Sequence, residues 1–397
     1  MTEVEWKPKK INLSSGIILS GITLAIGLFI GLTWSAFAPY LGFSSTSTPE
    51  TVSKVNWSSL NEIYSTLAKN YDGEIDEKEL IEGAKKGMTE SLGDVYTVYM
   101  DSEEAEEFNK SLHGDVGGGI GIEFALRNNY PTVIRTLPDN PARKAGILAG
   151  DVIYKVNDEE VWELSTEEIA TKTRGEVGTE VKLTVVRNGK EKSFTMTREK
   201  INNVSAYIDY DGKTAILTVT RFDTDTGELV TKFAKEALEK NCKKLILDLR
   251  NNGGGYVSAA KDILSLWIDG KEILIQKSKH KNDETTYANR GKAILSDMKT
   301  IVLVNNSTAS ASEIVAGALK DYKKATLVGE QTYGKGVVQS LFDVSDDSLL
   351  KITVASWYTP LGNSINKTGI TPDIEVELTY DDTNNMRDPQ LDKAKSL

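Results

Sequence analysis

The spacing of hydrophobic positions changes along the chain. Near the N-terminus, the pattern predicts a membrane-spanning helix. Residues 17–38 form a predominantly apolar run without a charged side chain. That is about the length that an α-helix needs to cross a membrane. Because Lys7, Lys9 and Lys10 precede the run, residues 1–16 are expected in the cytoplasm and the rest outside. We therefore predict a retained, single-pass signal anchor in the cell membrane, with an extracytoplasmic remainder.

A cleaved signal peptide is the alternative to this anchor. Ala36-Phe37-Ala38 has the small-x-small form of a cleavage site. However, Pro39 follows directly, and the apolar run is longer than the hydrophobic region of an ordinary signal peptide. We favour the anchor, followed by a polar linker over residues 39–50.

Residues 51–104 have apolar positions at helical spacing and predict a helical N-terminal region. The first helix carries Val52, Val55, Leu60, Ile63, Tyr64 and Leu67. Asp76 and Glu79 have the spacing of a capping box at the start of a second helix. This region is a candidate dimerisation element, so a homodimer is one of the partner states that we consider.

Residues 105–200 contain short β-like runs separated by glycine. The expected strands cover 120–124, 132–134, 151–156, 181–186 and 192–196. Asn188-Gly189 predicts a two-residue hairpin turn before the last strand. One short helix is expected over 166–173. The segment therefore predicts a small β-rich domain.

Residues 201–380 alternate between strand and helix patterns. Strands are expected at 215–219, 245–249, 301–304 and 325–328, and helices at 228–239, 257–267 and 313–319. Short apolar strands between helices predict a mostly parallel sheet covered on both faces. In such sheets the loops at the carboxyl ends of the strands carry the site. The polar tail, residues 381–397, has a short helix over 388–395 and no assigned function.

Composition excludes several kinds of site. The formal net charge is -11, and no basic cluster beyond the N-terminus could neutralise nucleic-acid phosphates. Cys242 is the sole cysteine, so an intrachain disulfide is impossible, and we expect a small buried side chain. His113 and His280 lack neighbouring carboxylates, so we predict no metal.

Two loops follow predicted strands and carry candidate chemistry. In the first, residues 248–255, three consecutive glycines can present backbone N–H groups to an anion. A nucleotide site is disfavoured because the glycines are contiguous and no Gly-Lys-Ser/Thr follows. A flexible connection remains the alternative.

In the second loop, residues 304–314, Ser310 and Glu313 have the spacing of a capping box, which local structure alone would explain. Ser310 would also have its hydroxyl in the positive field of a helix N-terminus, with the N–H of Ala311 free to bind an oxyanion.

Lys335 is the candidate base for such a serine. It lies between two glycines and close to Val337 and Val338. An apolar environment lowers the affinity of a lysine for its proton, so the amine can act as general base. If the segment is extended, Gln339 lies on the same face and could orient the amine. A solvated surface charge is the alternative for Lys335.

These loops closely resemble the C-terminal processing peptidases, the tail-specific (carboxyl-terminal) protease family of serine endopeptidases within peptidase family S41. The resemblance rests on 248–255, on 307–313 and on Gly334-Lys335-Gly336 with Gln339, and it extends to 87–100, 357–362 and 369–374. It implies an α/β (crotonase/ClpP-like) serine protease core within a multidomain α+β chain. It makes Ser310 the nucleophile, ahead of Ser307 and Ser312.

The same resemblance assigns the remaining roles in the site. Lys335 is the general base, Gln339 orients it, and Ala311 and Gly255 supply the oxyanion-hole amides. No cofactor is implied.

The β-rich domain resembles a PDZ domain. Gly119-Ile120-Gly121-Ile122 would be its carboxylate-binding loop, and an added substrate strand would pair along its edge. Arg174 is a regulatory candidate that would couple peptide occupancy to the catalytic site; a solvated helix-end cation is the alternative. The expected substrates are proteins with exposed apolar C-termini. A catalytically silent peptide-binding scaffold and an acyl-thioester hydrolase are the alternatives in function.

Overall fold

The computed structural model describes residues 56–112, 114, 117–127, 129–280, 282–379, 381, 382, 385 and 387–397. The predicted anchor, the cytoplasmic segment and the linker lie outside these residues. In the part of the chain that is described, none of the helices combines the length and the apolar character needed to cross a membrane. The chain divides into two compact units, residues 1–76 and 77–397.

The first unit contributes helix α2 (Ser58–Asn70). None of its residues is buried, and its large apolar side chains are all exposed: Leu60, Ile63, Tyr64 and Leu67. The first predicted helix is therefore confirmed over Ser58–Asn70, whereas Val52 and Val55 lie outside the described residues. Its role in dimerisation stays a prediction.

The second unit begins with three elements that precede the β-rich domain. They are α3 (Glu77–Glu90), β1 (Val98–Met100) and α4 (Ser102–Leu112). Strand β1 pairs with β18 (Leu349–Tyr358) of the predicted protease core. Ala105 on α4 packs with Met100 and Leu349 in the same small cluster. This contact ties α4 to the core, while the start of the β-rich domain at residue 105 stays a prediction.

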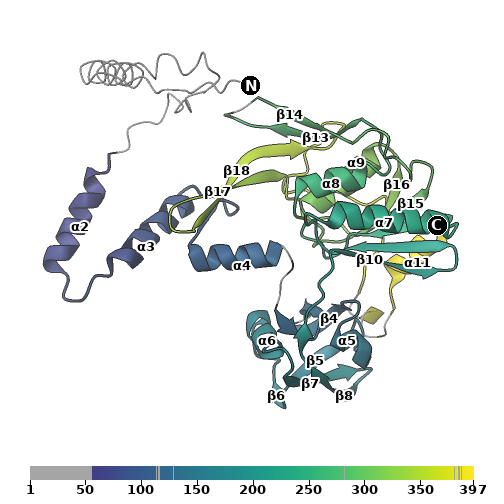
Figure 1. Ribbon diagram of the computed structural model, residues 1–397, viewed down its shortest axis with the longest axis horizontal. Coiled ribbons are helices and arrows are strands. Elements are labelled where there is room, and N and C mark those ends of the chain that lie inside the picture. The colour runs from purple at the N-terminus through teal and green to yellow at the C-terminus, as the bar shows by residue number, and fades with distance from the viewer. Residues whose placement is uncertain are drawn as a thin grey trace, which may run out of the picture. The chain divides into compact units, whose positions relative to one another are not determined.

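The β-rich domain is an antiparallel sheet with two short helices (Figure 1). Its elements are β2 (Gly118–Gly119), β3 (Ile122–Arg127), β4 (Tyr130–Thr136), α5 (Pro141–Ala145), β5 (Val152–Val156), β6 (Glu159–Glu160), α6 (Thr166–Thr173), β7 (Glu180–Arg187), β8 (Lys190–Thr197) and β9 (Glu199–Lys200). The strand order is β3-β4-β5-β7-β8, with β6 beside β5 and with β2 paired to β9. Asn188 and Gly189 have φ of 52° and 71°, as the predicted hairpin turn requires.

The catalytic candidates lie on a six-stranded sheet of order β10-β11-β12-β15-β16-β19. Its strands are β10 (Ala206–Asp211), β11 (Thr214–Val219), β12 (Lys244–Asp248), β15 (Lys299–Val304), β16 (Ala325–Gly329) and β19 (Ile374–Glu375). The strands from β11 to β19 are parallel, and β10 is antiparallel to β11. The predicted, mostly parallel sheet is therefore confirmed.

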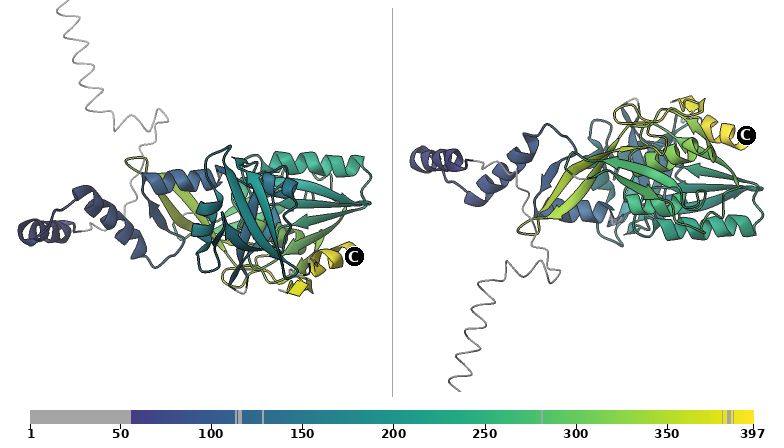
Figure 2. Two further views of the ribbon diagram at one scale, coloured as in Figure 1. Left: turned by 90° about the horizontal axis from the view of Figure 1, so that it is seen from below. Right: turned by 90° about the horizontal axis from the view of Figure 1, so that it is seen from above.

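Helices cover both faces of this sheet, as predicted. They are α7 (Thr226–Glu239), α8 (Val257–Leu264), α9 (Ala311–Asp321) and α11 (Pro389–Ser396). Because side chains alternate along a strand, Leu245 and Leu247 pack with α7, α8 and α9, whereas Ile246 packs with Ala394 of α11. Figure 2 shows α11, in yellow, on the opposite side of the sheet from the green helix α7. Helix α11 of the predicted tail thus packs against the core sheet.

A second core sheet is antiparallel and was not predicted. It contains β1, β18, β13 (Glu272–Lys277), β14 (Glu284–Tyr287) and β17 (Val337–Asp343). Strands β17 and β18 form a hairpin-like pair that carries Gln339 and Lys351.

Candidate active site

Ser310 has an unusual backbone conformation at the start of α9. It is the N-cap residue, with φ 55° and ψ -118°. A non-glycine residue in such a region is strained by about 1–3 kcal/mol and persists only where its surroundings fix it. The N–H of Ser310 donates to Glu313 Oε2 at 2.9 Å, and the N–H of Ala309 donates to the carbonyl of Asn252 at 3.0 Å. Strain held in this way is typical of functional residues.

The two competing serines lie in less suitable places. Ser312 is fully buried, and its Oγ donates to the carbonyl of Asn252 at 2.9 Å. Ser307 is exposed, with its Oγ 3.2 Å from Asn306 Oδ1. Of the three, only Ser310 is among the described residues that line the cavity of the candidate site. The structure therefore favours Ser310 as the side chain that can meet a substrate.

One cavity of about 570 Å³ brings the candidate residues together. Ser310, Lys335 and Gln339 line it together with residues 253–255. Apolar side chains form much of the remaining wall, among them Phe108, Leu112, Tyr256, Val257, Ile314, Val337, Val338 and Trp357. Segments that lie far apart in the sequence thus meet in a mostly apolar hollow, large enough for part of a peptide.

Lys335 is half-buried in the loop before β17. Burial lowers the pKa of its amine, and the positive charge of Lys351 lowers it further, whereas Glu313 opposes the shift. Its Nζ lies 5.2 Å from the centroid of the Tyr96 ring. Lys335 therefore loses its proton more readily than an ordinary lysine, and the neutral amine is the form that a general base needs.

Glu313 connects the serine loop to the lysine loop. Its Oε2 accepts the N–H groups of Ser310 and Lys335, each at 2.9 Å, and its Oε1 accepts Gly334 N–H at 2.8 Å and Thr332 Oγ1 at 2.6 Å. The side chain is fully buried, and burial raises its pKa while these hydrogen bonds oppose the rise. The sequence pattern indicated only the capping box, so this connection was missed.

The glycine loop lies directly against the serine. Gly254 has φ 99°, and a Cβ there would lie 2.8 Å from each of three atoms: Ala309 O, Ala311 N and Ser310 Cβ. Its own N–H donates to Asn252 Oδ1 at 2.9 Å. Only glycine fits such a close approach at a positive φ.

The amides of Gly255 and Ala311 are the better candidates for an oxyanion hole. Ala311 is the first residue of α9, so it has no intrahelical acceptor. No described residue provides an acceptor for either N–H group. Gly255 is fixed by its neighbours, because Gly254 O and Tyr256 N both bond to Phe222.

Gln339 lines the cavity but makes no hydrogen bond to Lys335 in the described structure. Its Nε2 is buried without a hydrogen-bond partner among the described residues. The register of β17 and β18 shifts between Val338 and Gln339, so simple alternation does not relate Gln339 to Lys335. The predicted orienting role stays a prediction.

The predicted carboxylate-binding loop is fixed through its carbonyl oxygens. Ile120 O accepts Ala142 N–H at 2.8 Å, and Gly121 O accepts Leu137 N–H at 2.9 Å. The loop connects two strands: Gly119 is the last residue of β2, and Ile122 is the first residue of β3. Between them, Ile120 is buried. Strand β3 contacts helix α6.

Gly121 requires glycine in this loop. It has φ 75°, and a Cβ there would lie 2.2 Å from Asn140 Cβ. The packing of an ordinary β-domain core does not account for this conformation.

Arg174 is the C-cap residue of α6, and its side chain is exposed. The next residue, Gly175, donates its N–H to Gly118 O at 3.2 Å. Arg174 therefore lies beside the strand that leads into the predicted carboxylate-binding loop.

Two other sequence predictions concern residues outside the site. Cys242 is buried, as expected. His280 is exposed, and His113 lies outside the described residues.

Comparison with known proteins identifies the parts of the chain. Residues 213–376 match the model of peptidase family S41, and residues 118–197 match the PDZ domain. Residues 22–104 match the N-terminal domain of the activating protease CtpB. A probable CtpA-like serine protease of Staphylococcus aureus strain COL is 37% identical over 373 residues, which cover 94% of this chain and 73% of the relative. The chain belongs to this family of S41 serine proteases.

A second relative, a probable CtpA-like serine protease of Staphylococcus epidermidis, is 36% identical over 325 residues. The match covers 81% of this chain and 66% of that relative, so this chain spans just under two thirds of the relative's length. The predicted family and its two recognised domains are therefore confirmed. The residues that match the PDZ domain, 118–197, lie within the predicted range 105–200.

Two solved structures are similar to this chain in fold. A photosystem II D1 C-terminal processing protease has 27% sequence identity and a TM-score of 0.55, covering 80% of this S41 protease and 87% of that chain. A putative S41 protease from Bacteroides fragilis has a TM-score of 0.57 at 17% identity, covering 87% and 97%.

Proposed function

We propose that this S41 protease is a membrane-anchored, extracytoplasmic serine endopeptidase with a Ser310–Lys335 dyad. It recognises apolar C-termini of protein substrates through its PDZ domain and hydrolyses their peptide bonds. The observation that carries the proposal is the convergence of Ser310 and Lys335 on one cavity, with both backbones bonded to the same buried carboxylate of Glu313.

The dyad would work through an acyl-enzyme. The neutral Lys335 amine takes the proton of Ser310 Oγ as that oxygen attacks the peptide carbonyl carbon. The tetrahedral oxyanion accepts hydrogen bonds from the N–H groups of Ala311 and Gly255. When the intermediate collapses, Lys335 returns the proton to the leaving amine, and the substrate acyl group stays on Ser310. Lys335 then deprotonates a water molecule, which attacks the ester carbonyl carbon. When the bond to Ser310 Oγ breaks, Lys335 returns the proton to that oxygen, and the carboxylic acid product leaves.

The PDZ domain would supply substrate recognition. The terminal carboxylate of a substrate is expected at the amides of residues 119–122, and the substrate strand is expected to extend along β3, beside α6. The D1 C-terminal processing protease bears a name that describes processing at a C-terminus, which agrees with this proposal.

The membrane is the other proposed partner. Residues 17–38 have the length and apolar character of a span, and the lysines before them favour a cytoplasmic N-terminus. Cell fractionation and protease protection of intact cells test this topology. Recovery of the full chain in the soluble fraction would contradict it.

Degradation of an unfolded protein with an apolar C-terminus tests the dyad. The full chain in detergent is compared with Ser310→Ala and Lys335→Ala, and Ser307→Ala is the matched control because that serine is exposed outside the cavity. We expect cleavage by the wild type and by the control alone. Cleavage by Ser310→Ala would refute the assignment, and binding of the substrate without cleavage by any variant would favour a scaffold.

A further inference from the structure

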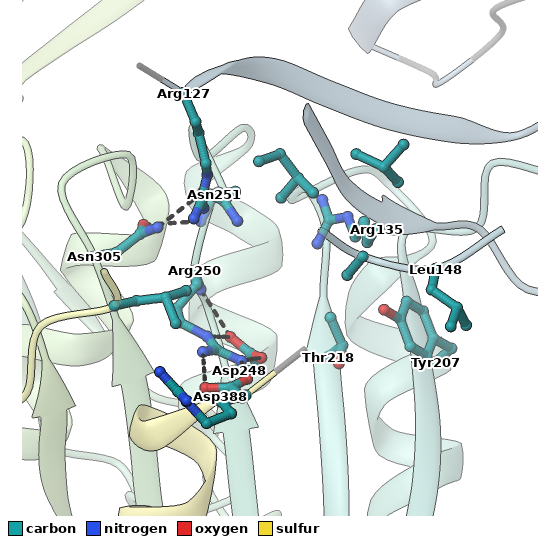
Figure 3. A pocket seen from close by; sticks show the side chains of 15 residues that line it. Arg127, Arg135, Leu148, Tyr207, Thr218, Asp248, Arg250, Asn251, Asn305 and Asp388 are labelled. Atoms are coloured by element: carbon teal, nitrogen blue, oxygen red, sulfur yellow. Dashed lines mark hydrogen bonds and ion pairs between the residues drawn. The ribbon is translucent and has the colours of Figure 1, made fainter. Parts of the chain in front are cut away.

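Arg250 follows the last residue of strand β12 by two positions and lies between two carboxylates (Figure 3). Its Nη2 is 2.7 Å from Asp248 Oδ2 and 2.9 Å from Asp388 Oδ2, and its Nη1 is 2.9 Å from Asp388 Oδ1. Gln390 Oε1 accepts a further hydrogen bond from Nη1 at 3.0 Å. Asp388 thus forms a two-pronged ion pair with Arg250 across 138 positions of sequence.

The segment that supplies Asp388 is itself firmly attached. Asp388 caps α11, because its Oδ1 accepts Leu391 N–H at 2.9 Å. Gln390 is buried, and its Nε2 donates to Val376 O at 2.8 Å. Ala394 packs against the sheet on the face opposite α7, α8 and α9. The segment can therefore hold Arg250 in a fixed place.

Arg250 begins the segment that carries the proposed oxyanion amide, residues 250–255, which we call the oxyanion loop. Asn251 follows with φ 58°, and its N–H donates to Asn305 Oδ1 at 2.9 Å. The side chain of Asn252 then bonds to Val219 O at 2.8 Å and accepts Gly254 N–H at 2.9 Å. Hydrogen bonds thus attach Asn251, Asn252 and Gly254, and Arg250 is the position of the loop that ion pairs attach to α11.

The negative charge of Asp388 is important because it neutralises the largely buried guanidinium group of Arg250. The side chain of Arg250 is 12% exposed, so its charge depends on nearby carboxylates rather than on water. Arg250 also lines a second cavity, of about 400 Å³, together with Arg127 and Arg135 of the PDZ domain, which add positive charge around it (Figure 3). Without Asp388, Asp248 would be the remaining ion-pair partner of Arg250 among the described residues.

We propose that Asp388 is a positioning residue for catalysis, which holds the oxyanion loop in place through Arg250. The inference rests on the proposed peptidase function, and it gives a role to the C-terminal segment around α11. Asp388 acts at a distance from the substrate, so its loss should reduce turnover more than substrate binding.

The test compares Asp388→Asn with Asp388→Glu and with Asp392→Asn in the full chain. Asp392→Asn is the matched control, since it removes one negative charge from an exposed position of the same helix. We expect Asp388→Asn to lower kcat about tenfold to hundredfold, with KM within about twofold of the wild type. Asp388→Glu should recover part of kcat because it restores the charge.

Amide hydrogen exchange over residues 249–256 provides a readout that does not depend on turnover. We expect faster exchange in Asp388→Asn and wild-type exchange in Asp392→Asn. The inference would be overturned if Asp388→Asn changed neither kcat nor the rate of amide exchange. It would also be overturned if Asp388→Asn lowered the unfolding temperature but kept the wild-type kcat at temperatures where the protein is folded. If the wild type itself cleaves no peptide, the proposed function fails, while the exchange experiment still decides whether Asp388 holds the loop.

Discussion

The Oε2 atom of Glu313 accepts a hydrogen bond from the backbone N–H of Lys335, 2.9 Å away. The same oxygen accepts the N–H of Ser310, so one buried carboxylate fixes the spacing of the proposed nucleophile and base. A spacing fixed before substrate binds saves the cost of ordering the two groups during the reaction.

Glu313→Gln is expected to reduce both activity and stability. The amide NH2 of glutamine would face backbone N–H donors whichever way it is turned, which leaves buried donors unpaired. We expect a loss of about 1–3 kcal/mol in the free energy of unfolding and about a hundredfold loss in kcat. Chemical denaturation and steady-state kinetics measure the two effects. Glu239→Gln, at an exposed position, is the control, and wild-type kcat in Glu313→Gln would refute the proposed connection.

Gly254→Ala should inactivate the site, and Gly253→Ala should be far milder. A Cβ at Gly254 would lie 2.8 Å from Ala311 N and from Ser310 Cβ, whereas a Cβ at Gly253 would meet nothing within 4 Å. Gly254 also has φ 99°, so alanine there is strained by about 1–3 kcal/mol. Kinetics and thermal unfolding of the pair check this expectation. Equal effects of the two substitutions would show that the close approach of Gly254 does not matter.

Lys351→Met is expected to change the pH dependence of cleavage. Burial is the larger cause that lowers the pKa of Lys335, and the positive charge of Lys351 is the second. Removing that charge should raise the pKa of Lys335. Because the base acts in its neutral form, the acidic limb of the profile of kcat/KM should then move to higher pH.

The profile of kcat/KM against pH measures this shift. Lys277→Met, at an exposed position on β13, is the control for the loss of a charge. An acidic limb that stays in place in Lys351→Met would argue against Lys335 as the titrating base.

Arg174→Ala is expected to weaken the stimulation of cleavage by peptides that occupy the PDZ domain. Arg174 ends α6 beside the strand leading into the carboxylate-binding loop, and its side chain is exposed. Turnover is measured with and without a C-terminal peptide, and Glu167→Ala on the same helix is the control. Stimulation equal to that of the wild type would refute a coupling role for Arg174.

Local patterns determined much of the fold. The apolar run of Leu245, Ile246 and Leu247 predicted a strand buried on both faces, and Asn188-Gly189 predicted the hairpin turn of the PDZ domain. Ser310 with Glu313 marked the start of α9, within two residues of the expected helix. These signals are readable because each depends on neighbours in the sequence.

Contacts between distant segments could not be read in this way. The sequence does not show that β1 pairs with β18, or that α4 packs with the core rather than with the PDZ domain. The bulge at Gln339 also depends on its partner strand, so alternation alone could not place that side chain.

Local sequence signals were enough to predict the order of the PDZ domain and the protease core, the parallel sheet and, through resemblance, the candidate residues Ser310 and Lys335. Three relationships are visible only in the folded chain: Glu313 holds both loops, Lys351 lies near the base, and Asp388 holds Arg250. Burial and hydrogen bonding depend on which segments meet in space, so no local pattern reports them. In the sequence, Glu313 is indistinguishable from an ordinary helix-capping residue, and Asp388 from any polar residue of the tail.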